Sequence, residues 1–390
     1  MLDLVIRSGG RFWSWIGLLV AVIVGAGIAY LWQLKMGLTI TGLSRDVSWG
    51  FYVAQLTFLV GVAASAVMLV LPYYLHNFKE FGKITIVGEF TAVATICMCL
   101  LFLFVDLGQP ARAFNVFLHP TPNSVIFWDG TVLSAYMLVN IIVGWNVLQA
   151  ERNGMAPPTW IKPLILFSIP LAFCIHTVTA FLYCGLPGRS FWLTAILAPR
   201  FLASAFASGP AFLILLLYIL RRVSGFDVGE KAIAALMTII RYGLLANLFF
   251  LVCEAFVVFY SNIPEHTAHF MYLYAGLEGK HALVPWMWLS VVLMVAAMWL
   301  LLVRRAYSNP RLIPAICIMV FLGTWIDKGL GLIAGGFIPS MTHEITEYVP
   351  TVLEVVISIG VYGIGALILS ILLNVVVRVR QDRAGRLAKA

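Results

Sequence analysis

Ten apolar runs dominate the sequence and constrain its fold more than any other feature. They lie at 12–34, 49–75, 83–105, 124–148, 162–184, 201–221, 232–260, 283–303, 311–333 and 349–377. About 20 apolar residues in a helix span the hydrocarbon core of a bilayer. The chain is 62% hydrophobic and only 11% charged, which leaves too little polar surface for a soluble globule. The sequence therefore predicts an all-α, polytopic membrane protein with about ten transmembrane helices.

Lysine and arginine are distributed unequally between alternating loops. One side, which includes both termini, carries Arg7, Arg11, Lys79, Lys83, Arg152, Lys162, Arg221, Arg222, Lys231, Arg304, Arg305, Arg311, Arg378, Arg380, Arg383, Arg386 and Lys389. The other side carries only Lys35, Arg45, Arg112, Arg189, Arg200 and Lys280. Because cytoplasmic loops are enriched in these residues, both termini are expected in the cytoplasm, with the chain in the inner membrane. The net charge of +8 is then explained by topology and indicates no nucleic-acid partner.

The start of the chain and its cysteines add two expectations. No small-residue cleavage site follows the first apolar run, so we expect a retained helix rather than a removed signal peptide. The six cysteines lie in or beside apolar runs without a CxxC pair, and Cys97 and Cys99 point to nearly opposite helix faces. They are expected to be packing residues, so the chain should carry no metal and no iron–sulfur cluster of its own.

Ionisable residues fall in two layers within the predicted spans. The residues of the outer half are Asp106, Asp129, His176, Glu254, Asp327, Lys328 and Glu354. Glu89 and Arg241 lie in the inner half. Such groups are costly in a membrane unless they have a partner or a function. We expect a proton-handling site that opens toward the outer face, with a proton path formed by Glu89, Arg241, Glu254, Asp327 and Glu354.

Three stretches resemble a known family. SWGFYVAQLTFLVGVAASAVML (48–69) resembles the second-helix motif of the NrfD/polysulfide-reductase membrane subunits. VDLGQPARAFNVF, followed by HPTPNSVIFWDGTVLSAY, is similar to the family's Asp-Leu-Gly-x-Pro segment and Pro-Asn-Ser loop. YVPTVLEVVISIGVYG (348–363) resembles the last helix of hydrogenase-associated members. The long loop with IPEHTAHF and LEGKHALVPWMW is most similar to the DsrP branch, which belongs to a sulfur-metabolism complex.

The resemblance implies a quinone-interacting electron-transport subunit built from two four-helix bundles and two flanking helices. The corresponding divisions are 1–48, 49–184 (first bundle, with the candidate quinone site), 185–333 (second bundle) and 334–390. It implies menaquinone or ubiquinone as cofactor, without haem or iron–sulfur cluster in this chain. Implied partners are a ferredoxin-like iron–sulfur subunit on the outer face, a multihaem cytochrome c, a haem b membrane subunit and a cytoplasmic iron–sulfur subunit. The loop 266–281, rich in aromatics and histidine, is expected to dock the outer partner.

Quinone chemistry needs a hydrogen-bond partner at each ring oxygen and a proton acceptor near one of them. We expect Asp129, Asp106 and His176 to be catalytic. The expected quinone contacts are Trp49, Arg112, Asn123, Asp129 and His176.

Structural roles would account for the same residues in other ways. Asp106 would pair with Arg112, and His176 would bond to a neighbouring helix. Asn123 and Ser124 would cap a helix, and Trp49 would belong to an interfacial belt. Glu89 and Arg241 would form a structural ion pair.

Other functions remain open from the sequence. Buried carboxylates and the Gly-rich segment 323–336 also suit an ion or solute transporter. A haem b anchor would need two histidines at one depth on facing helices, and no such pair is found among the seven histidines. A purely structural anchor is the third alternative.

Overall fold

The computed structural model describes residues 8–387, with side chains described up to residue 382. Arg7 and Lys389, counted above for topology, lie outside the described residues, and Arg383 and Arg386 lie outside those with described side chains. The ten long helices are α2 (Gly10–Met36), α3 with α4 (Phe51–Leu75), α5 (Thr85–Asp106), α7 (Val125–Asn153), α8 (Ile161–Cys184), α9 (Leu197–Ser224), α10 (Glu230–Ser261), α12 (Val284–Leu302), α14 to α15 (Ile313–Gly335) and α16 (Val352–Leu387). The prediction of an all-α polytopic membrane protein with about ten spans is confirmed.

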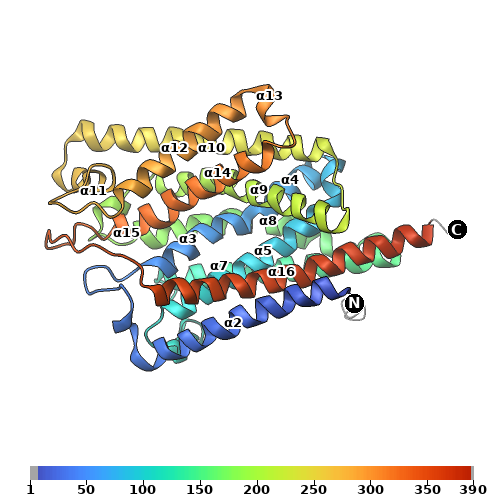
Figure 1. Cartoon of the computed structure of the whole chain (residues 1–390), viewed down its shortest axis with the longest axis horizontal. Helices are drawn as coiled ribbons and strands as arrows, with labels where there is room; N and C mark the ends of the chain where they lie inside the picture. The colour runs from blue at the N-terminus through green and yellow to red at the C-terminus, as the bar shows by residue number, and fades with distance from the viewer. Residues whose placement is uncertain (1–7, 388–390) are drawn as a thin grey trace.

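The helices run roughly parallel along the long axis of the molecule (Figure 1). Helix α5 packs against α3 and α7, and α7 packs against α8; we call these helices, with α4, the first helix group. Helices α9, α10, α12 and α14 to α15 form the second helix group, in which α9 contacts α10 and α14. The two groups meet along α3 and α9. Their identity with two four-helix bundles stays a prediction.

Helices α2 and α16 lie side by side along one edge of the molecule (Figure 1). Most of α2 is exposed, and its buried residues are Leu19, Ala26 and Gln33. These are seven residues apart and form one seam, as expected for a helix that packs on one side only. Gly360 of α16 lies against Ala26, so small side chains allow the two helices to approach closely.

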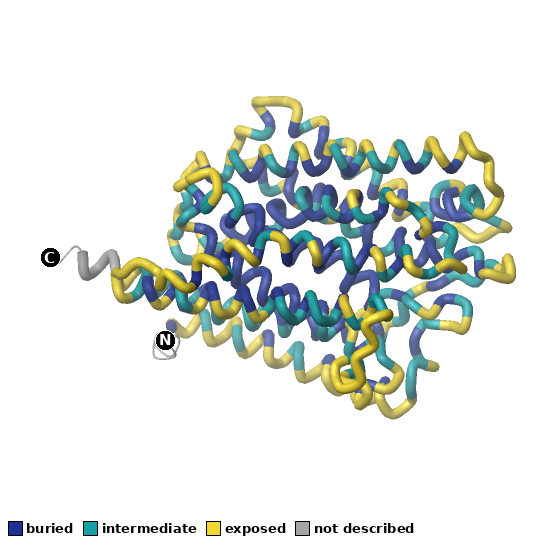
Figure 2. Tube along the Cα trace, turned by 180° about the vertical axis from the view of Figure 1, so that it is seen from behind, coloured by how far each residue is buried: buried dark blue, intermediate teal, exposed yellow. Residues whose placement is uncertain are grey.

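Helix α3 occupies the centre of the protein. Nearly all of its residues are buried, whereas many residues of the peripheral helices are exposed (Figure 2). Many of the exposed residues are large and apolar. A helix that is apolar all round and covered on every side belongs to the core. Its polar residues therefore have to find partners inside the protein.

The described ends of the chain lie at the same end of the molecule (Figure 1), as an even number of spans requires. At the opposite end, three segments pack into what we call the loop-side layer: residues 186–196, 263–283 and 336–351, including α11 (Pro264–Tyr274). Trp192 is fully buried there and donates a hydrogen bond from Nε1 to the Leu332 carbonyl at 2.8 Å. This end is the one predicted to face outward.

His269 fixes α11 within the loop-side layer. Its Nδ1 lies 2.9 Å from the Gly335 carbonyl oxygen and 2.8 Å from that of Ile338. Burial lowers the pKa of His269 below its ordinary value, because the charged ring would lose its hydration. The neutral ring therefore acts as a donor that joins α11 to the segment after α15.

Candidate functional site

Asp129 begins the buried stripe of α7. Asp129, Leu133, Tyr136 and Asn140 recur at helical spacing and face the interior. The Asp129 side chain is buried, and Thr179 of α8 donates a hydrogen bond to its Oδ1 at 2.6 Å. Among the described residues this is its one side-chain hydrogen bond, so Oδ2 is left for another partner.

A facing stripe on α8 carries His176, Thr179 and Tyr183, all fully buried. Their spacing of three and four residues places them on one helix face. His176 Nδ1 donates to the Ala172 carbonyl of the same helix at 3.0 Å, while Nε2 has no hydrogen-bond partner within residues 8–382. The bond to a neighbouring helix, considered above as a structural role for His176, does not form in this part of the chain.

The sequence did not point to Thr179, Tyr183 or Thr57. The Tyr183 hydroxyl forms a short hydrogen bond with Thr57 of α3, and it lies within electrostatic range of both Asp129 and Asp106. The regular spacing of polar groups from His176 onward was the signal that could have identified the α8 stripe. We call the residues Thr57, Asp129, His176, Thr179 and Tyr183 the polar seam, which lies between α3, α7 and α8.

Trp49 belongs to an aromatic cluster beside this seam. Its ring stacks on Trp192 with centroids 5.9 Å apart and meets the Tyr183 ring edge-on at 5.7 Å. Phe337 completes the cluster. Trp49 therefore packs between the seam and the loop-side layer rather than in a lipid-facing belt, and its contact with a quinone stays a prediction.

Asp106, Arg112 and Asn123 are placed differently from Asp129. Arg112 and Asn123 are exposed, and within residues 8–382 no ion pair joins Asp106 to Arg112. Asp106 Oδ1 is buried without a hydrogen-bond partner in that range. Ser124 precedes α7 but makes no side-chain capping bond. The quinone contacts predicted for Arg112 and Asn123 would require a ligand that extends to the exposed loop.

A polar network that the sequence did not reveal lies next to Asp106. Gln33 donates from Nε2 to the Val105 carbonyl at 2.8 Å, and its Oε1 accepts a hydrogen bond from the Tyr52 hydroxyl at 2.7 Å. Tyr52 lies within electrostatic range of Asp106. This network joins α2 and α3 to the end of α5.

The predicted ion pair between Glu89 and Arg241 does not form. Glu89 is buried on α5, where its Oε2 lies against Gly144 of α7 and has no hydrogen-bond partner in the described part of the chain. The Arg241 guanidinium lies over the Tyr307 ring, 4.2 Å from its centroid. The two side chains therefore have separate surroundings: Glu89 lies against α7, and Arg241 lies against Tyr307.

The second helix group pairs its acids with Arg200. This arginine, assigned above to a loop, is buried near the start of α9. It forms a short ion pair with Glu254 of α10 and donates from Nη2 to both Asp327 oxygens, at 2.7 and 2.9 Å. Asp327 and Lys328 lie on a π-helical turn, Ile326–Gly331, between α14 and α15. Such turns reorient side chains within a continuous helix and are frequent at functional sites.

Glu354 is held by a capping box at the start of α16. Its Oε2 accepts a hydrogen bond from the Thr351 amide at 2.8 Å, while its own amide donates to Thr351 Oγ1 at 3.3 Å. Tyr348 and the Gly42 amide supply further hydrogen bonds to the carboxylate. These bonds account for its burial, and its role in a proton path stays a prediction.

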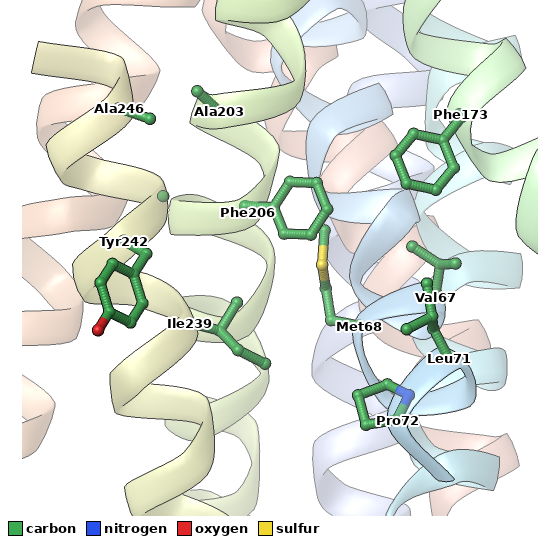
Figure 3. Close-up of a pocket in the computed structure, with 11 residues that line it drawn as sticks. Val67, Met68, Leu71, Pro72, Phe173, Ala203, Phe206, Ile239, Tyr242 and Ala246 are labelled. Atoms are coloured by element: carbon green, nitrogen blue, oxygen red, sulfur yellow. The ribbon is translucent and has the colours of Figure 1, made fainter. Parts of the chain in front are cut away.

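An apolar groove of about 420 Å³ lies between the two helix groups (Figure 3). It is lined by side chains of α4, α8, α9 and α10, including Met68, Phe173, Phe206 and Ile239. None of the predicted site residues lines it. Phe173, which lines the groove, lies one turn before His176 on α8. Among residues 8–387, no three His, Cys, Asp or Glu side chains gather closely enough to hold a metal ion.

Comparison with known proteins identifies relatives along most of the chain. A putative dimethyl sulfoxide reductase membrane subunit from Halobacterium salinarum is 24% identical and aligns with 91% of this chain and 89% of its own length. A subunit of the selenate reductase from Mesobacillus selenatarsenatis is also 24% identical, over 91% of each chain. An Hdr-like menaquinol oxidoreductase integral membrane subunit from Archaeoglobus fulgidus is 24% identical over 67% of this chain and 65% of its own.

These relatives do not single out the DsrP branch, which stays a prediction. The family match covers residues 39–340, from the segment before α3 into the segment after α15. It includes all the helices of both groups. The chain belongs to the family described as polysulphide reductase, NrfD.

Proposed function

We propose that this chain is the quinone-reactive membrane subunit of a multi-subunit oxidoreductase complex. The observation that carries the proposal is the placement of Asp129 and His176 on facing stripes of α7 and α8. Each keeps a polar atom free of protein partners among the described residues: Asp129 Oδ2 and His176 Nε2. A quinone needs one hydrogen-bonding group at each ring oxygen, and we assign these two atoms to that role.

A quinol, when bound, supplies two electrons and two protons. Asp129 would hold a proton at Oδ2, while the bond from Thr179 fixes its carboxylate. His176 would orient the second ring oxygen through Nε2, since Nδ1 is already committed to the helix backbone. Trp49 and Tyr183 would exclude water from the loop side of the seam. The predicted roles of Asp106, Arg112 and Asn123 would lie at the entrance to this site.

The loop-side layer is the proposed docking surface for a ferredoxin-like iron–sulfur subunit. The layer contributes Trp192 and Phe337 to the aromatic cluster around Trp49, and His281 and Lys280 are exposed on it. The relatives are named as subunits of reductases and oxidoreductases, which supports a multi-subunit assembly. The multihaem cytochrome c, the haem b membrane subunit and the cytoplasmic iron–sulfur subunit remain predictions from the DsrP resemblance.

The choice of quinone and the orientation are also parts of the proposal. The Archaeoglobus relative is named a menaquinol oxidoreductase subunit, which favours menaquinone over ubiquinone. The loop-side layer would face outward and both termini would be cytoplasmic in the inner membrane, following the distribution of Lys and Arg.

The transporter alternative has less structural support. The Gly-rich segment 323–336 continues as one helix through its π-helical turn, without the pair of separated half-helices that bind substrate in many transporters.

Purification of the intact complex from membranes tests the proposal. Lipid extraction and mass spectrometry should find a quinone and an iron–sulfur subunit at fixed stoichiometry with this chain. A homo-oligomer that lacks quinone and transports solute into liposomes would contradict it.

A further inference from the structure

Lys328 is the least explained charged residue in the protein. It is 4% exposed, and its Nζ has no hydrogen-bond partner and no ion pair among residues 8–382. The two buried carboxylates of the second helix group, Glu254 and Asp327, both form ion pairs with Arg200. Neither forms an ion pair with the Lys328 ammonium group. A buried ammonium group without partners is expensive, which indicates either a missing partner or a function.

Lys328 lies at the junction of the two helix groups. Its Nζ lies 4.2 Å from the centroid of the Phe201 ring on α9. A Cβ atom on Gly61 of α3 would lie 3.3 Å from Nζ, so the absence of a side chain at Gly61 makes room for the ammonium group. The π-helical turn directs Lys328 to this junction while its neighbour Asp327 binds Arg200.

A small cavity connects Lys328 to a second unpartnered atom. The cavity has a volume of about 10 Å³ and is lined by Arg200, Ser204, Asn247, Asp327 and Lys328, among others. Asn247 Oδ1 is also buried without a hydrogen-bond partner in the described part of the chain. A volume of about 10–15 Å³ with two to four polar partners is what a buried water molecule requires. An unpaired donor and an unpaired acceptor thus border one water-sized space.

A second cavity of the same volume also borders Arg200 and Asp327. It is lined by Arg200, Asp327 and Tyr274, and Tyr274 belongs to α11 of the loop-side layer. Both cavities therefore border the contact between Arg200 and Asp327. Water molecules in both would form a polar connection from the loop-side layer to Lys328.

The charged and titratable groups around Lys328 come from five elements. Asp327, Arg200 and Glu254 form the ion cluster, and the two cations balance the two carboxylates when Lys328 is protonated. On the first-group side, Cys99 of α5 and His176 of α8 lie within electrostatic range of Nζ. Lys328 is thus placed between the polar seam and the ion cluster.

We propose that a water molecule binds between Lys328 Nζ and Asn247 Oδ1, and that Lys328 exchanges protons between the polar seam and the loop-side layer through it. The ammonium group passes one proton to an acceptor on the seam side and takes one from the bridging water. The bridging water takes a proton in turn from water in the second cavity, so the transfers balance and nothing is oxidised or reduced. The exchange with the seam rests on the proposed quinone function, whereas the water site does not.

Two kinds of experiment test the inference. Cryo-electron microscopy of the purified complex, at a resolution that shows ordered water, should reveal density between Lys328 and Asn247. An unfilled cavity there would overturn the water site, whether or not the chain reacts with quinone.

Variants test the exchange of protons. Lys328→Arg keeps the positive charge but cannot release a proton at ordinary pH, so quinol-linked electron transfer should fall about tenfold or more, with an altered pH profile. Asn247→Leu keeps every charge and removes the water's acceptor, and should slow turnover in the same way. Lys231→Met, which changes an exposed lysine, is the control.

The outcomes separate the two claims. A Lys328→Arg complex with the wild-type rate and pH profile would show that Lys328 is a static charge and overturn the exchange. A wild-type complex without quinol-linked turnover would instead contradict the proposed function, and the density map would still decide the water site.

Discussion

The two helix groups bury acidic side chains in opposite ways. In the second group, Glu254 and Asp327 are both neutralised by Arg200. In the first group, Asp129 receives one hydrogen bond from a neutral hydroxyl and Glu89 Oε2 receives none from the described residues. A paired carboxylate is satisfied by the protein, whereas an unpaired one must be neutral or must meet a ligand. This difference supports the proposal that the first group holds the quinone site, while the paired acids of the second group contribute to its stability.

Removing Arg200 should give the largest effect. Arg200→Met leaves two carboxylates buried without compensation, which should destabilise the protein by about 3–5 kcal/mol. The measurement is the thermal unfolding midpoint and yield of the purified complex. Arg222→Met, at the exposed end of the same helix, is the matched control. An unfolding midpoint like that of the wild type would show that the ion cluster is not structural.

Removing the Thr179 hydroxyl should impair the reactive side without unfolding it. Thr179→Val keeps the shape of the side chain but removes the hydrogen bond to Asp129, so quinol oxidation should slow about tenfold. Thr177→Val is the matched control, since Thr177 bonds only the backbone of its own helix. If the two variants oxidised quinol at the same rate, Thr179 would not be part of the site.

Neutralising Glu89 should change stability little. Because Glu89 forms no ion pair, Glu89→Gln should leave the unfolding midpoint close to that of the wild type, whereas Glu254→Gln removes a partner of Arg200 and should lower it. Thermal unfolding of the two variants side by side measures the difference. If the unfolding midpoint fell more in Glu89→Gln than in Glu254→Gln, the assignment of Glu89 as unpaired and Glu254 as paired would be wrong.

The smallest expected effect is the pH response of α11. Burial lowers the pKa of His269, so at mildly acidic pH its ring binds a proton in the unfolded segment but not in the folded one. Its contribution to local stability is present above the unfolded pKa of about 6.5 and is lost as the pH falls below it. Hydrogen–deuterium exchange of residues 264–274, corrected for intrinsic rates, should show less protection at acidic pH. His269→Gln should lack this response, and equal protection in the wild type at both pH values would contradict it.

The sequence identified the spans well, because each span carries its own apolar signal. It also identified Asp129 and His176 as ionisable groups within spans. It missed Arg200, because an arginine three residues into α9 resembles a loop residue by hydropathy. The partners of Arg200 lie 54 and 127 residues away, so their pairing is a tertiary feature.

Two further residues show the limits of depth as a guide. Glu89 and Arg241 share a depth, but depth does not fix the direction in which a helix face points, and the pair does not form. The capping box of Glu354 was not predicted, although Thr351 and Glu354 have the T-x-x-E spacing of such a motif in the sequence itself. Local motifs are therefore readable from a single sequence, whereas contacts between helices are not.

Quinol-linked electron transfer by the Asp129→Asn complex tests the central claim most directly. Asparagine keeps an oxygen that can accept the Thr179 hydrogen bond, so the complex should assemble. It cannot hold the proton of a carboxylic acid, so turnover should fall by about 10²- to 10⁴-fold. Turnover at the wild-type rate in a fully assembled complex would contradict the assignment of Asp129 as the proton-accepting group of the quinone site.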